Sequence, residues 1–251
     1  MSSQIILTVS DVSKSFAGNK VLHNISFAIQ QGEKVAIIGS SGAGKTTLLH
    51  LIAGIIQPDS GYVHINGKSL NGLKPGRELS ELVGVIHQQF DLVPQISVVQ
   101  NVLVGRLGQW SLLRSILSMI WPIERGLASK ALARVGLSGK QLERTSNLSG
   151  GEQQRVAIAR MLVQDPELFI ADEPVASLDP TRASYLIELL GQVTDQTGKT
   201  LVTSLHSLDL VRKNFTRLIG LRNGIQVFDL DCQDVTDGMI KELYDIEEIG
   251  T

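Results

Sequence analysis

The 251-residue sequence lacks features that would each point to a class of protein. A single cysteine, Cys232, excludes an internal disulfide framework and a cysteine-rich zinc site, and it fits a reducing compartment. The 23 lysines and arginines are balanced by 25 acidic residues, so no basic surplus predicts nucleic-acid binding. No basic leader and no run of about 20 apolar residues is present, so we expect neither a signal peptide nor a membrane-spanning helix. Any membrane role must therefore come through a partner.

Strand-like and helix-like segments alternate along the chain, which predicts an α/β fold with a mainly parallel core sheet. Strands are expected at residues 5–12, 21–29, 33–38, 62–65, 82–86, 168–171, 200–204, 217–221 and 225–229, and helices at 45–53, 181–197, 207–215 and 235–246. Asn66-Gly67 predicts a turn between the strands at 62–65 and 82–86. Residues 90–164 instead show helical periodicity, which predicts a helical insertion.

A glycine-rich segment follows the expected strand at 33–38 and precedes a helix. Its sequence matches G-x-x-x-x-G-K-[ST] and consists of Gly39, Ser40, Ser41, Gly42, Ala43, Gly44, Lys45 and Thr46. Glycines let backbone N–H groups wrap a phosphate, and the helix N-terminus adds partial positive charge. Lys45 supplies a point charge for the β- and γ-phosphates, and the Thr46 hydroxyl is a ligand for Mg²⁺.

Two carboxylates follow a second apolar strand, in the sequence LFIADE at 168–173. Open α/β sheets bind ligands at the carboxyl ends of their strands. Asp172 is expected to hold Mg²⁺ through water, and Glu173 to activate the attacking water as a general base. The alternative is an acidic pair that only caps a helix.

Residues 148–160 read LSGGEQQRVAIAR and lie between these two motifs. A serine and two glycines opening a helix form a further anion site, although alone they could be a plain helix cap. Together and in this order, the three motifs resemble those of ABC-type ATPases over nearly the whole chain. The resemblance implies a P-loop NTPase fold with an N-terminal antiparallel β portion. It also implies a single domain, 1–251, with a RecA-like core (1–89 and 166–230), a helical signature subdomain inserted at about 90–165, and a short helical tail (231–251).

The resemblance further implies roles for single residues. Phe16 occupies the adenine-stacking position, and Thr47 joins the nucleotide-binding residues. Gln88, or Gln89 beside it, aligns with the Q-loop glutamine that touches Mg²⁺ and the attacking water. His206 aligns with the switch histidine that senses the γ-phosphate, and Asp179 with the D-loop. Glu152 stands where the family consensus has glutamine.

The family pattern also implies partners and cofactors. Two copies would pair head to tail with two ATP molecules and Mg²⁺ between them. The signature residues of one copy would contact the other copy's ATP; they are Ser149, Gly150, Gly151 and Glu152. Two transmembrane permease subunits and, through them, an extracytoplasmic substrate-binding protein would complete a transporter on the cytoplasmic face of the inner membrane. No nucleic-acid partner is expected.

Several segments resemble the phosphonate importer ATPases, a subfamily that includes importers of phosphite. They are NVLVGRLG at 101–108, ADEPVASLDP at 171–180, SLHSLDLV at 204–211, RLIGLRNG at 217–224 and WSLLRSILSMIWPIE at 110–124. The alternatives are the ATPase of an exporter or lipoprotein-extraction complex and, more remotely, a DNA-repair ATPase. Leu113, Ile116, Leu117 and Ile120 fall on one helical face. That face would either pack the subdomain or border a permease groove.

Overall fold

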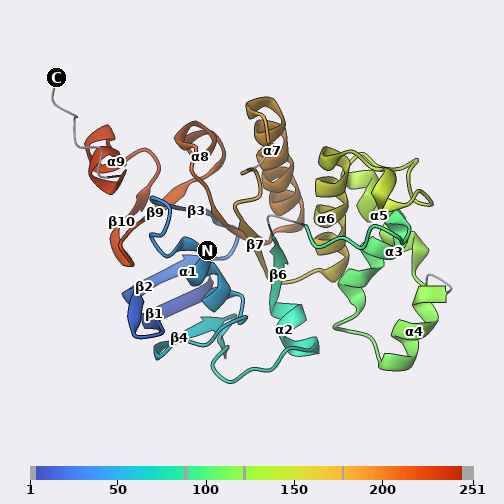
Figure 1. The fold of residues 1–251 in the computed structure, drawn as a ribbon, viewed down its shortest axis with the longest axis horizontal. Coiled ribbons are helices and arrows are strands. Elements are labelled where there is room, and N and C mark those ends of the chain that lie inside the picture. Colours follow the sequence, from blue (N-terminus) through green and yellow to red (C-terminus); the bar gives the residue numbers. More distant parts are fainter. Residues whose placement is uncertain (1–3, 88–89, 121–122, 177, 245–251) are drawn as a thin grey trace. The chain divides into compact units, whose positions relative to one another are not determined.

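A computed structural model describes residues 4–87, 90–120, 123–176 and 178–244. The chain separates into two compact units (Figure 1). The first contains residues 1–73 and 200–251, and the second contains residues 74–199. The expected helical insertion, 90–165, lies within the second unit, which also contains β6 (Val83–Ile86), β7 (Leu168–Asp172) and α7 (Pro180–Thr197).

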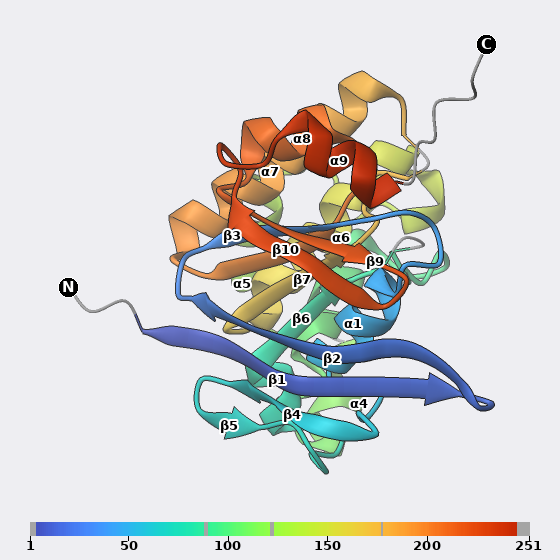
Figure 2. The ribbon, with the colours of Figure 1, turned by 90° about the vertical axis from the view of Figure 1, so that its left-hand side faces the viewer.

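An antiparallel sheet forms one part of the first unit, as Figure 2 shows. Its strands run in the order β2-β1-β4-β5 and are β1 (Ile5–Phe16), β2 (Asn19–Gln30), β4 (Ser60–Ile65) and β5 (Lys68–Ser69). The long β1–β2 hairpin alternates buried and more exposed positions, with Leu7, Val9 and Val12 in the core. This alternation is typical of a sheet with one covered face.

Parallel strands form the other part of the first unit. β3 (Lys34–Ile38) pairs in parallel with both β8 (Thr200–Ser204) and β9 (Arg217–Arg222), and β10 (Ile225–Asp231) runs antiparallel to β9. The helices of this unit are α1 (Lys45–Ile52), α8 (Leu208–Asn214) and α9 (Asp237–Tyr244). Every residue of β8 is buried, including the polar Thr200, Thr203 and Ser204, so the strand is covered on both faces. Because β3 and β8 pair in parallel, their carboxyl ends lie side by side.

The second unit contains the parallel pair β6–β7 and most of the helices. Its helical elements are α2 (Arg77–Leu82), α3 (Val98–Leu103), η1 (Val104–Arg106), α4 (Leu112–Ile120), α5 (Arg125–Arg134), η2 (Thr145–Asn147), α6 (Gly150–Gln164) and α7. α3 and α5 pack on α6 through buried residues such as Val102, Leu132 and Ile158. The fully buried Asn101 fastens this core, because its amide donates to Val93 O (2.9 Å) and to Thr145 Oγ1 (2.7 Å).

The expected strands at 5–12, 21–29, 33–38, 168–171, 200–204, 217–221 and 225–229 are confirmed with small changes at their ends. The expected strand at 62–65 and the turn at Asn66-Gly67 are also present, but the turn does not lead directly to the strand at 82–86. Both residues have positive φ (49° and 73°), so the turn folds the chain straight back into β5, where Ile65 pairs with Lys68. The helix α2 then precedes β6 and includes Leu82, which the sequence pattern places in the strand. The C-terminal helix is present as α9, and the predicted residues 245–246 lie outside the described part of the chain.

Candidate functional site

The glycine-rich loop of the first unit joins β3 to α1 in a conformation that requires glycine. Gly39, Gly42 and Gly44 have φ of 155°, 80° and 101°. A Cβ on Gly39 would lie 2.1 Å from Leu221 O, and one on Gly44 would lie 2.7 Å from Leu22 Cδ2. The loop is also tied to the β9–β10 turn, where Gly224 N donates to Ala43 O at 3.0 Å. The sequence therefore builds a rigid loop, and its shape is fixed by the first unit itself.

Lys45 lies inside this loop and is only 4% exposed. Its Nζ donates to Gly39 O (2.9 Å) and Ser40 O (3.0 Å), so the ammonium is held at the mouth of the loop. Thr46 is exposed and Thr47 half-buried at the start of α1, while Ser41 and Gly42 are exposed at the tip of the loop. This arrangement of helix N-terminus, ammonium and hydroxyl suits a phosphate chain.

His206 belongs to the same edge of the first unit. Leu205 N donates to Ile37 O at 3.2 Å, and Ile37 pairs with Ser204 in the parallel ladder. His206, which follows directly, is exposed at the end of β8 beside the end of β3 that carries the glycine-rich loop. The pairing thus brings the predicted switch histidine and the phosphate loop to one edge.

Phe16 ends β1 in the first unit, and its side chain is 46% exposed. Lys14 Nζ lies 5.5 Å from the centroid of the Phe16 ring. An exposed aromatic ring at a fixed strand end can stack on a planar base. The ring is therefore not buried in the core.

In the second unit, Asp172 ends β7 and Glu173 follows with a positive φ of 45°. Both are half-buried, and Ala176 N donates to Glu173 O at 3.2 Å, which fixes the turn. Ile86 pairs with Ala171, so the end of β6 lies beside these carboxylates. Gln88 and Gln89 follow β6 but lie outside the described residues. Their expected role therefore stays a prediction.

Asp179 is the N-cap of α7. Its Oδ1 accepts from Arg182 N at 3.0 Å, and Oδ2 lies 3.3 Å from Arg182 Nε. Pro180 occupies the first helical turn, where its missing N–H costs nothing. Asp179, the predicted D-loop aspartate, therefore has a local structural role, and it is exposed at the surface of the second unit.

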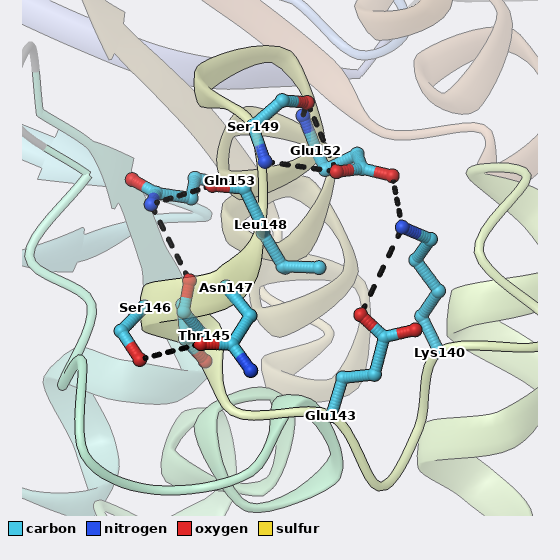
Figure 3. A network of polar contacts seen from close by, with 9 residues as sticks. All are labelled: Lys140, Glu143, Thr145, Ser146, Asn147, Leu148, Ser149, Glu152 and Gln153. Atoms are coloured by element: carbon cyan, nitrogen blue, oxygen red, sulfur yellow. Dashed lines mark hydrogen bonds and ion pairs between the residues drawn. The ribbon is translucent and has the colours of Figure 1, made fainter.

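The signature residues open α6, with Ser149 as its N-cap (Figure 3). Ser149 N–H and its hydroxyl donate to the same Glu152 oxygen, Oε2, at 2.8 and 3.0 Å. Lys140 Nζ binds the other oxygen, Oε1, at 2.6 Å. The bond from Lys140, followed by the two from Ser149, lowers the pKa of Glu152 from 4.5 to about 2. Glu152 is therefore a carboxylate whose charge is paired with Lys140.

Gly150 and Gly151 differ from the glycines of the phosphate loop. A Cβ on either would meet nothing within 4 Å among the residues that the structure describes, and neither has a positive φ. A surface pocket of about 210 Å³ opens beside them, with Ser149, Gln154, Arg155 and Arg182 in its lining. The helix N-terminus thus leaves space at its surface for an outside group.

Thr46 in the first unit and Asp172 in the second each carry an oxygen atom of the kind that binds magnesium. In the described parts of the chain, no three His, Cys, Asp or Glu side chains cluster as a metal cage. Mg²⁺ commonly uses one or two protein oxygens and completes its shell with phosphates and water. The exposed Thr46 hydroxyl and the Asp172 carboxylate are donors of that kind.

Membrane insertion is the remaining structural question that the sequence raised. Among the residues that the structure describes, no helix is both long and apolar enough to cross a bilayer.

The chain belongs to the ABC transporter family, whose profile matches residues 22–176. This confirms the family that the three motifs predicted. Two relatives are named as phosphonate import ATP-binding proteins PhnC. The Nostoc sp. protein PhnC 1 is 45% identical over 97% of this chain and 94% of its own length. The Pseudomonas putida protein is 43% identical over 92% of this chain and 87% of its own length.

Solved structures confirm the predicted fold class. The cbiO1 subunit of the Clostridium perfringens ABC transporter complex cbiONQ has a TM-score of 0.81 at 29% identity, covering 95% of this chain and 94% of cbiO1. The ATP-binding cassette MJ0796, described as a dimer in a post-hydrolysis state with ADP and Pi, has a TM-score of 0.74 at 28% identity. That similarity covers 92% of this chain and all of the MJ0796 chain.

Two residues that contact these segments could not be identified from the sequence. Arg160 on α6 donates to the carbonyls of Asp91 (2.8 Å) and Phe90 (2.6 Å), which follow the predicted Q-loop residues in the chain. Lys140 binds Glu152 from a separate loop. Arg160 was visible as the last residue of the signature segment, but nothing in the sequence pairs it with Phe90. Lys140 has no sequence signal at all.

Proposed function

We propose that this chain is the ATP-hydrolysing subunit of an ABC importer for phosphonates or a related reduced-phosphorus oxyanion such as phosphite. The observation that carries the proposal is the 45% identity to a phosphonate import protein over 97% of the chain. That span includes both units as well as the nucleotide motifs. The similarity to several further PhnC proteins at 40–43% identity supports the same substrate class.

In the proposed reaction the chain binds ATP with Mg²⁺, and each motif has one task. The phosphate loop and Lys45 bind the phosphates, Phe16 stacks on the adenine, and Thr46, Asp172 and Gln88 hold the metal. When bound, Mg²⁺ neutralises charge on the β- and γ-phosphates. Glu173 takes a proton from the attacking water, and His206 contacts the γ-phosphate and senses its presence.

The active unit we propose is a head-to-tail pair of this chain, with one ATP at each of two shared sites. The open surface at Gly150 and Gly151 supports this arrangement, because no atom of the described residues lies within 4 Å of a Cβ added there. A mixed dimer with Lys45→Ala on one copy and Ser149→Arg on the other should keep one site free of both changes. It should retain about half of the ATPase activity per dimer, or less if the sites cooperate. An ATP wholly enclosed by one copy would contradict the pairing.

We also propose that the second unit carries the contact with the permease. A groove of about 140 Å³ in that unit is lined mainly by apolar atoms, including those of Ile96, Leu103, Leu107 and Trp110. Leu113 and Leu117 on α4 are 70% and 50% exposed, so this part of the face does not pack the subdomain core. The side chains of Ile116 and Ile120 lie outside what the structure describes.

A scan of α4 tests this contact. Leu113→Asp and Leu117→Asp should leave folding and basal ATP hydrolysis intact, because both side chains already face solvent. Assembly with the permease, or stimulation of hydrolysis by substrate, should fall. Arg125→Asp, an exposed change on the neighbouring α5, serves as the control for added negative charge. Normal assembly and uptake in both leucine variants would remove α4 from the interface.

Uptake by the reconstituted transporter tests the function as a whole. The chain, two permease subunits and the extracytoplasmic binding protein should import a phosphonate or phosphite in an ATP-dependent way, in preference to phosphate. Through the permease, the chain would lie on the cytoplasmic face of the inner membrane. Export without a binding protein would favour the exporter or lipoprotein-extraction class, and DNA-stimulated hydrolysis would favour the repair class.

A further inference from the structure

The carboxylate of Glu152 creates an electrostatic problem at the signature motif. It accepts both donors of Ser149 through Oε2, so it lies at the N-terminus of α6. On the proposed function, the γ-phosphate of the partner copy's ATP must approach the same serine. Two anions would then compete for one helix N-terminus and one hydroxyl, and like charges at close range repel.

Lys140 is placed to remove this conflict, as Figure 3 shows. Its Nζ lies 2.6 Å from Glu152 Oε1 and 3.8 Å from Glu143 Oε2. The Glu152 side chain is 17% exposed and Lys140 36% exposed, so water screens the closer pair only in part. The ammonium therefore binds the carboxylate oxygen that Ser149 leaves open, and the pair carries no net charge.

The loop that carries Lys140 is itself anchored. Lys140 N donates to Leu137 O, and Glu143 N donates to Lys140 O, both at 3.2 Å. Two further backbone bonds of 2.9 Å join the loop to the start of α3, from Val98 N to Glu143 O and from Val99 N to Gln141 O. The backbone thus presents Lys140 to Glu152 from a defined position.

We propose that Lys140 is a positioning residue for the ATP of the partner copy, and this rests on the proposed function. By binding Glu152 Oε1, Lys140 neutralises the carboxylate and weakens the hydrogen bond that the Ser149 hydroxyl donates to Oε2. The hydroxyl and the backbone N–H groups of α6 can then turn to the γ-phosphate. Lys140 acts on the phosphate through Glu152 and Ser149.

The test is a double-mutant cycle in full-length protein carrying Glu173→Gln, with ATP-driven dimerisation measured by analytical ultracentrifugation. Lys140→Met should weaken dimerisation about tenfold, and more at low salt, because one unpaired charge then faces the phosphate. Lys140→Arg should restore it. In a Glu152→Gln background, Lys140→Met should have a much smaller effect, since the carboxylate beside Ser149 is then absent and Lys140 keeps the more distant Glu143, 3.8 Å away.

Controls separate this inference from simpler explanations. Lys130→Met removes an exposed lysine of α5 in the same unit and should leave dimerisation unchanged. Binding of ATP to the monomer should be equal in all variants. An equal loss from Lys140→Met whether Glu152 is intact or replaced by Glu152→Gln would show a merely structural role and overturn the inference. Failure of the Lys140-containing protein to dimerise with ATP would instead overturn the proposed paired function.

Discussion

The phosphate loop and the signature motif are both glycine-bearing helix N-termini, yet their glycines meet different physical demands. Gly39 and Gly44 have positive φ, and an added Cβ would approach other atoms of the chain within 3 Å. Gly150 and Gly151 are helical residues with open space around them. The first pair is needed for the fold of its own unit, whereas the second leaves room for something outside the chain.

The phosphate loop and the signature motif also differ in the charged residue that each one carries. Lys45 is buried in the phosphate loop and donates to the loop's own carbonyls. The signature helix instead carries Glu152, an acceptor that already binds the Ser149 donors. The phosphate loop is therefore preorganised for an anion, while at the signature a carboxylate of the same chain already accepts the Ser149 donors.

We expect the largest effect from Glu173→Gln, which should hold the protein in the ATP-bound dimer, where both motifs contact the nucleotide. Glu173→Gln should lower ATP turnover about 10²–10⁴-fold, because it removes the general base without removing a phosphate contact. The variant should bind ATP and accumulate as a dimer, as size-exclusion chromatography with light scattering would show. Near-normal hydrolysis by the folded variant would reject the role of Glu173.

Alanine substitutions at the two glycine pairs test the comparison directly. Gly39→Ala combines a disfavoured φ with a contact of 2.1 Å to Leu221 O, and should cost about 2–6 kcal/mol of stability. Gly150→Ala should leave stability unchanged or slightly raised, because alanine favours helix by up to about 1 kcal/mol. Thermal denaturation measures both.

ATP-driven dimerisation should be weakened by Gly150→Ala even though the stability of this variant is not. Gly150→Ala should bind ATP as a monomer like the unsubstituted chain but pair less well, since its methyl group fills the open surface. A stable Gly39→Ala protein, or a Gly150→Ala protein that unfolds, would contradict the distinction between the two glycine pairs.

The sequence predicted what depends on short-range patterns. Strands such as 33–38 and 168–171 follow from near-continuous apolar runs, and Lys45 and Thr46 follow from a spacing that phosphate binding requires. Ser149 and Glu152 have the spacing of a capping box, which the structure contains. These features are local, so neighbouring residues suffice to reveal them.

Long-range contacts could not be predicted in the same way. Asn101 and Thr145 are separated by 44 positions, and their hydrogen bond depends on the packing of α3 against α6. Lys140 reaches Glu152 only because its loop is bound to α3. Such pairs depend on the tertiary structure. From the sequence alone, a polar residue such as Asn101 would be expected at the surface.

Asn101→Ala tests whether the signature motif depends on the buried hydrogen bonds of the second unit, to which the phosphate loop does not belong. Asn101→Ala removes the hydrogen bonds to Val93 and Thr145 and leaves the buried Thr145 hydroxyl without its amide donor, at a cost of about 1–3 kcal/mol. ATP binding by the monomer, measured by calorimetry, should remain. Dimerisation should weaken, because Thr145 precedes the signature. Loss of ATP binding in a folded variant would show that the two sites are not independent.

The smallest expected effect is the pH dependence of the Glu152 pair. The pKa of Glu152 is lowered to about 2 in the folded chain, first by Lys140 and then by Ser149. Its contribution to stability is therefore complete above pH 4.5 and is lost as the pH falls toward about 2. Because the pair is partly exposed, we expect about 1 kcal/mol or less. In Lys140→Met, an NMR titration of the Glu152 side chain should give a higher pKa that stays below 4.5, because both Ser149 donors remain. An identical titration in the two proteins would mean that Lys140 does not hold this carboxylate in solution.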